Sequence, residues 1–148
     1  MEETRSTLFG VCLVLIAVLL GWFATAVQIG AQQQDQNDGW KIPSGAAEEK
    51  NPLTVNETLL AGGRKIFVSK CVRCHGPKGE GDGEDADMDL KKDMDLTRAD
   101  RADANPDGVV FFKVWNGRQE PRMPSFEDQL SKEQAWAVVA YVQTLRRR

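Results

Sequence analysis

Apolar and polar positions divide the chain into three regions. Residues 8–27 read LFGVCLVLIAVLLGWFATAV, a continuous apolar run without a charged side chain. The following stretch is rich in Gln, Asn, Asp and Gly and shows no apolar period, and from residue 54 apolar residues return at helical spacing. The pattern therefore predicts a short N-terminal segment (1–7), an anchor helix (8–29), a flexible polar linker (30–53) and a folded domain (54–148).

The apolar run has the length of one transmembrane helix, because twenty helical residues rise by about 30 Å, the hydrocarbon thickness of a bilayer. Cys12 within it reads as a small apolar side chain. A cleavable signal peptide, cut at Ala24-Thr25-Ala26, is the alternative. Against it, the run exceeds the usual apolar region of about 7–15 residues, and the MEETRS before it is not basic. We expect residues 8–29 to stay in the lipid bilayer as a single-pass anchor.

Apolar spacing predicts helices in the folded domain. The first begins at Thr54 or Asn56, both of which are suitable N-caps, and ends at Lys70. A second helix is expected over residues 107–115, although an apolar run as short as GVVFFKVW is also compatible with a strand. The fold class indicated is a small all-α domain.

The last helix has the clearest start signal. Ser131 and Gln134 have the spacing of a capping box, and apolar residues then repeat at helical spacing up to Leu145. Between the first helix and residue 107, the segment 80–95 holds eight acidic residues against two lysines, with glycines at 76, 79, 81 and 83 before and within it. We expect this segment to be an irregular, solvated acidic loop. Its acidic residues lack the order of an EF-hand calcium loop.

Composition excludes some classes of function. The formal net charge is −3, so bulk charge does not favour a nucleic-acid partner. The three cysteines include one close pair and one residue inside the apolar run, which is not the pattern of a disulfide scaffold. The close pair is therefore the place to look for chemistry.

The stretch CVRCHG, residues 71–76, concentrates the reactive side chains. Zinc would need four ligands, and Cys71, Cys74 and His75 supply three at most. A redox dithiol would be expected beside a strand–helix–strand pattern, which the flanking helical periods do not show. Covalent haem attachment uses all three residues, since each thiol adds to one vinyl group and the histidine binds the iron. The motif therefore predicts one haem c held through Cys71 and Cys74, with its iron on His75.

The sixth iron ligand is expected to be a methionine, because the chain has no second histidine. Met88 and Met94 lie in the acidic loop, soon after the haem motif. Met123 lies much further along, in the proline-flanked stretch PRMPSF, which favours an extended loop. Met123 is therefore the preferred candidate, with Met88 and Met94 as alternatives.

Taken together, CVRCHGPKGEGDG, the helix with Gly63 and Phe67 before it, RMPSF, and LSKEQAWAVVAYVQTL resemble class I cytochrome c over about residues 54–145. The resemblance implies a small all-helical domain in which the first and last helices cross closely, with Gly62 or Gly63 at the crossing. The proposed iron ligands show no departure from the family pattern.

A haem with His and Met on its two faces has no open iron position and is suited to passing single electrons. We therefore predict a membrane-tethered electron carrier of a respiratory or photosynthetic chain, not an enzyme, with redox proteins as partners and no small-molecule substrate. The haem domain is expected on the periplasmic or other extracytoplasmic side. One alternative is a fixed subunit of a larger membrane redox or reaction-centre complex, and a more distant one is a haem gas sensor or peroxidase.

Overall fold

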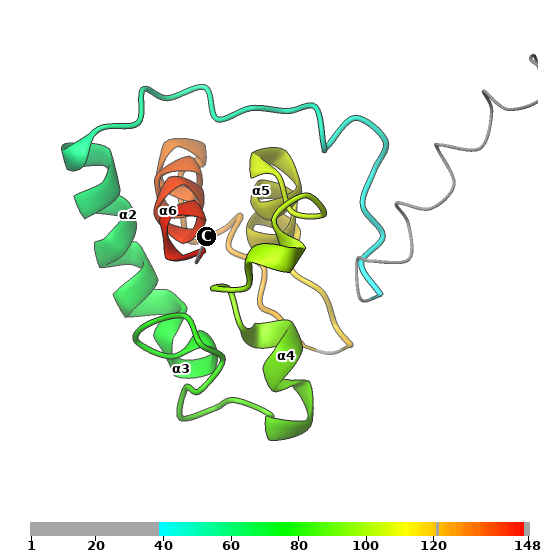
Figure 1. Cartoon of the computed structure of the whole chain (residues 1–148). Helices are drawn as coiled ribbons and strands as arrows, with labels where there is room; N and C mark the ends of the chain where they lie inside the picture. The colour runs from blue at the N-terminus through cyan, green and yellow to red at the C-terminus, as the bar shows by residue number, and fades with distance from the viewer. Residues whose placement is uncertain (1–38, 121, 147–148) are drawn as a thin grey trace, which may run out of the picture. The chain divides into compact units, whose positions relative to one another are not determined.

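Two helices from opposite ends of the domain, α2 (Glu57–Lys70) and α6 (Lys132–Leu145), lie side by side (Figure 1). The computed structural model describes residues 39–120 and 122–146. The other elements in this part are α3 (Val72–His75), the 3-10 turn η1 (Met88–Leu90), α4 (Lys91–Met94), the 3-10 turn η2 (Ala99–Arg101) and α5 (Asp107–Asn116). These residues contain isolated bridges but no strand. The predicted all-α class is therefore confirmed for the domain, and α5 is not a strand.

Side-chain caps set where α2 and α6 begin. The Asn56 Oδ1 accepts a hydrogen bond from the Leu59 N–H at 2.9 Å, so α2 uses the second of its two predicted caps. In α6 the Ser131 Oγ accepts from the Gln134 N–H at 3.2 Å, and the Gln134 Oε1 accepts from the Ser131 N–H at 2.9 Å. The predicted capping box is confirmed.

The contact between α2 and α6 depends on Gly63. A Cβ atom at this position would lie 2.1 Å from the Ala137 carbonyl oxygen, whereas a Cβ at Gly62 would meet nothing within 4 Å. Gly63 therefore makes the close approach that was predicted for one of the two glycines. One turn further along α2, Phe67 is fully buried, and its ring centroid lies 5.4 Å from that of Tyr141 on α6.

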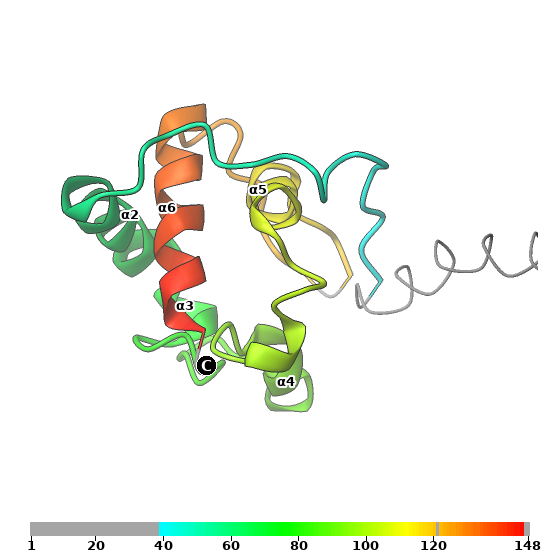
Figure 2. The same cartoon turned by 45° about the horizontal axis from the view of Figure 1, so that its top comes forward.

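The apolar core is shared among three helices, because α6 lies between α2 and α5 in both views (Figures 1 and 2). The Phe111 ring of α5 stacks on the Trp136 ring of α6, with centroids 4.2 Å apart. The buried core residues are Phe67, Val110, Val114, Phe126, Ala135, Trp136, Val138, Val139 and Val142. More than half of them belong to α6, so this helix supplies the surface on which the others assemble.

Residues 39–53, which we call the strap, pass α5 and α6 before α2 begins (Figure 1, cyan). The Gly108 N–H donates to the Glu49 carbonyl at 3.1 Å, and the Asn51 side-chain amide donates to the Trp136 carbonyl at 3.0 Å. Ala46 is buried. The sequence predicts a flexible linker up to residue 53, and here the structure differs. Hydrogen bonds to backbone carbonyls hold the strap on the domain, and apolar periodicity does not reveal such bonds. The domain therefore begins at residue 39 or earlier, not at residue 54.

The predicted anchor helix (8–29) and the first part of the predicted linker lie outside the described residues. Within residues 39–120 and 122–146, no helix combines the length and the apolarity required to cross a bilayer. The anchor therefore stays a prediction from the sequence.

The close crossing gives a matched pair of variants. We expect Gly63→Ala to lower the free energy of unfolding by about 3 kcal/mol, because the new methyl group overlaps the Ala137 carbonyl and forces the helices apart. Gly62→Ala meets open space, so its better helix propensity should raise stability by up to about 1 kcal/mol. Urea unfolding of the haem-loaded protein measures both. Equal effects of the two substitutions would contradict the proposed role of Gly63.

Candidate haem site

The two cysteines lie on one helical turn at the end of α2. Cys71 is the C-cap residue of α2. Its carbonyl accepts hydrogen bonds from the backbone N–H groups of Cys74 at 3.2 Å and His75 at 2.9 Å. Both thiols are partly exposed and are not joined in a disulfide. Burial, and secondly Cys74, raises the pKa of Cys71 to about 12.

The imidazole of His75 is oriented by a backbone carbonyl. Its Nδ1 lies 2.7 Å from the Met94 carbonyl oxygen. Because a carbonyl only accepts, Nδ1 carries the proton and the lone pair is on Nε2. Burial lowers the pKa of His75, although the hydrogen bond to Met94 opposes this shift, so the neutral form that binds metals is favoured. No residue in the described part of the chain forms a hydrogen bond with Nε2.

The loop after His75 folds back to supply this carbonyl. The Gly81 N–H donates to the His75 carbonyl at 2.9 Å, and the Leu96 N–H donates to the Gly79 carbonyl at 2.7 Å. These bonds bring the end of α4, with Met94, beside the histidine. The acidic segment is therefore more ordered than the irregular loop predicted from its composition, since it forms η1 and α4.

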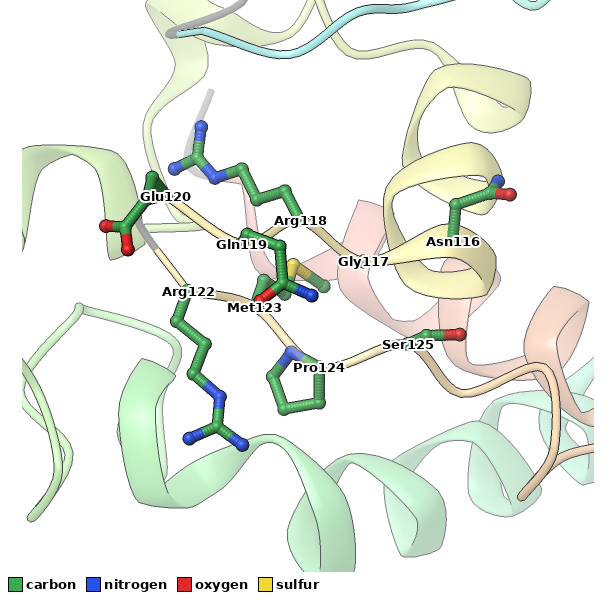
Figure 3. A pocket seen from close by; sticks show the side chains of 9 residues that line it. All are labelled: Asn116, Gly117, Arg118, Gln119, Glu120, Arg122, Met123, Pro124 and Ser125. Carbon is green, nitrogen blue, oxygen red and sulfur yellow. The ribbon is translucent and has the colours of Figure 1, made fainter.

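Met123 lies in the loop between α5 and α6 (Figure 3). Its N–H and carbonyl pair with the carbonyl and N–H of Arg118 at 2.9 and 2.8 Å. The side chain is partly buried and packs against the core, and in Figure 3 it lies behind that of Gln119. A pocket of about 670 Å³ runs along this loop, with Met123 in its lining but none of Cys71, Cys74 and His75. The structure thus groups the motif residues together and places Met123 on a separate element.

The other two methionines differ in position. The Met88 side chain is 67% exposed. Met94 contributes its backbone to the Nδ1 side of the His75 ring. Met88 is therefore largely exposed and Met94 lies by its backbone on the Nδ1 side of His75, whereas Met123 packs partly buried against the core.

A cationic cluster, in which Lys113 is buried and three arginines are partly exposed, lies near both loops. Lys113 is 9% exposed, and its Nζ donates to the Asn105 Oδ1 at 2.6 Å. Burial, and then the charges of Arg101, Arg118 and Arg146, lowers the pKa of Lys113 to about 7. Such a concentration of positive charge suits an anionic partner. A haem carries two carboxylates, so the charge of this cluster has the sign that would pair with them, and the Nε2 of His75 suits its iron.

Comparison with known proteins decides the family. The family model described as "Cytochrome c" matches residues 60–146, which is more than half of the chain. The chain belongs to the cytochrome c family. A cytochrome c6 from Parathermosynechococcus lividus is 32% identical over 83 residues, covering 56% of this chain and 86% of the relative. The resemblance to class I cytochrome c is therefore confirmed.

Membership of the cytochrome c family also settles the cofactor, which is one covalently bound haem c with its iron. Cys71 and Cys74 have the spacing of its attachment motif. The predicted haem is thus confirmed, and the zinc and dithiol interpretations of the motif are set aside.

Sequence reasoning missed three parts of the site. The partner of His75 is the Met94 backbone carbonyl, for which no side-chain signal exists. Lys113 was read only as part of an apolar helix, although a charge inside GVVFFKVW was a visible signal. Arg146 looks in the sequence like one more charge at the end of the last helix, but its guanidinium donates to the Ala102 carbonyl at 3.1 Å and the Asn105 carbonyl at 2.7 Å.

Replacing the cysteines tests the covalent attachment. We expect Cys71→Ser with Cys74→Ser to abolish haem staining on a denaturing gel, because no thioether remains. Each single variant should keep one thioether, with the absorption spectrum of a haem that retains one vinyl group. Cys12→Ser is the matched control and should stain like the unmodified chain. Retained staining in the double variant would contradict the assignment.

Proposed function

We propose that this protein carries single electrons through its haem c, with His75 and Met123 as the axial iron ligands. The observation that carries the proposal is the orientation of His75. Its Nδ1 is committed to the Met94 carbonyl, and its Nε2 has no hydrogen-bond partner among the described residues. This is the usual arrangement of a metal-binding histidine, whose second nitrogen is fixed by an outer partner.

The choice of Met123 rests on chemistry and position. A thioether is the soft donor left in a chain with one histidine. Met123 is partly buried in a loop that its pairing with Arg118 holds in shape, whereas Met88 is exposed. When bound, the haem iron supplies a one-electron ferric–ferrous couple, which a methionine ligand shifts to higher potential.

The residues of this chain then have three tasks. Cys71 and Cys74 hold the macrocycle, and the Met94 carbonyl keeps the His75 ring in one orientation and one tautomer. The arginines around Lys113 would pair with the haem carboxylates. Iron held by both His75 and Met123 would leave no position for small ligands, which favours an electron carrier over a gas sensor or a peroxidase.

Removing the sulfur ligand tests this function. We expect Met123→Ala to lose the long-wavelength absorption band of sulfur bound to ferric iron, to bind carbon monoxide readily when reduced, and to lower the reduction potential by on the order of 0.1 V. Met88→Ala should match the unmodified protein in all three measurements. Ready binding of carbon monoxide by the unmodified protein would instead support the sensor or peroxidase class.

The proposed carrier is tethered to a membrane by residues 8–29, with the haem domain on the extracytoplasmic side. The continuous apolar run supports this placement. Its partners are redox proteins of a respiratory or photosynthetic chain. The acidic segment 80–95 is the candidate docking surface, although Asp85 and Asp93 are engaged within the domain by Arg73 at 2.9 Å and Arg101 at 3.5 Å. A fixed subunit of a larger membrane complex is the second candidate.

Fractionation of native membranes tests the tether. We expect all haem-stained chain to sediment with the membranes and to resist a carbonate wash, because only detergent releases an anchored helix. A native gel in mild detergent then shows a stained band near the monomer mass for a shuttle, or at high mass for a complex subunit. A stained soluble chain beginning after Ala26 would mean that residues 1–26 are a signal peptide.

A further inference from the structure

The N-terminal end of the strap lies beside the loop that carries Met123 (residues 117–125), which we call the ligand loop. The indole ring of Trp40 has the Arg118 Cζ 4.6 Å from its centroid and the Lys113 Nζ at 5.3 Å. In Figure 3, Arg118 points away from Met123 and toward the strap, while Arg122 points to the opposite side. One aromatic ring therefore covers a cation of α5 and a cation of the ligand loop together.

The two sides of Met123 are held in different ways. On its C-terminal side, the Ser125 Oγ donates to the Trp115 carbonyl at 2.7 Å, and the Phe126 N–H donates to the Val114 carbonyl at 3.2 Å. On its N-terminal side, the Gly117 N–H donates to the Lys113 carbonyl at 3.0 Å, and the bonds that close the loop are those between Met123 and Arg118. The position of Arg118 thus determines whether this side of the loop is closed.

We propose that Trp40 is a positioning residue for Met123. By covering the Arg118 side chain while resting on Lys113 of α5, the indole fixes the residue whose backbone pairs with the methionine. The strap thereby supports the sulfur–iron bond from outside the haem site. This inference rests on the proposed function, in which Met123 is an iron ligand.

A general role of the strap in stability is a different idea, and the chain offers a control for it. The strap is also attached through Asn51, whose side-chain amide donates to the Trp136 carbonyl at 3.0 Å. That contact is on α6 and does not involve the ligand loop. Asn51→Ala therefore loosens the strap without changing the cover of Arg118.

The experiment compares Trp40→Leu, Trp40→Phe and Asn51→Ala in the full haem-loaded chain in detergent. We expect Trp40→Leu to raise backbone amide exchange of the 117–123 peptide by about tenfold. The same variant should weaken the sulfur–iron(III) band and admit carbon monoxide to the reduced protein. Trp40→Phe keeps an aromatic face, so its effects should lie between those of Trp40→Leu and the unmodified protein. Asn51→Ala should leave the amide exchange, the sulfur–iron(III) band and the carbon monoxide binding unchanged.

Two outcomes overturn the proposal: unchanged exchange and spectra in Trp40→Leu, or equal effects of Trp40→Leu and Asn51→Ala. Should Trp40→Leu not fold, the comparison of Trp40→Phe with Asn51→Ala decides in the same way. Met123→Ala separates this question from the proposed function. If that variant keeps the sulfur–iron(III) band, the ligand assignment fails, whereas a lost band together with an unaffected Trp40→Leu rejects the role of Trp40 alone.

Discussion

The close crossing of α2 and α6 is the constraint on which the site depends. The Ala137 carbonyl lies where a side chain at Gly63 would be, so the helix axes approach to backbone contact. Phe67 is fully buried one turn later, and its carbonyl accepts from the Cys71 N–H at 2.9 Å. The haem motif follows this anchored turn directly. The packing of two helices thus determines where the thiols and the imidazole are presented.

Around this fixed turn, His75 and the proposed ligand Met123 are positioned by the segments that follow α3 and α5. The Met94 carbonyl fixes His75 through a loop that folds back on itself, and the Met123 loop is closed by its pairing with Arg118. Hydrogen bonds to backbone groups thus hold these two segments in place, whereas side-chain packing holds the helices together.

What could be predicted from the sequence was local. The Asn56 cap, the Ser131 capping box and the C-x-x-C-H spacing each depend only on residues a few positions apart in the chain. The choice between Gly62 and Gly63 required the position of α6. The strap was missed because its attachment relies on backbone carbonyls and on Trp40, which polar composition conceals. Met123 as a ligand stays a prediction, since it depends on a haem between two elements.

The strap changes the mechanics of the proposed tether. With residues 39–53 held on the domain, at most the nine residues 30–38 separate it from the predicted anchor, instead of the twenty-four in 30–53. As a random chain, a nine-residue connection has a root-mean-square span of about 17 Å, against about 27 Å for twenty-four residues. The smaller volume swept by the domain raises its effective concentration at the bilayer surface. For the proposed tethered carrier, a short connection favours electron exchange with neighbours in the same membrane over exchange with distant partners.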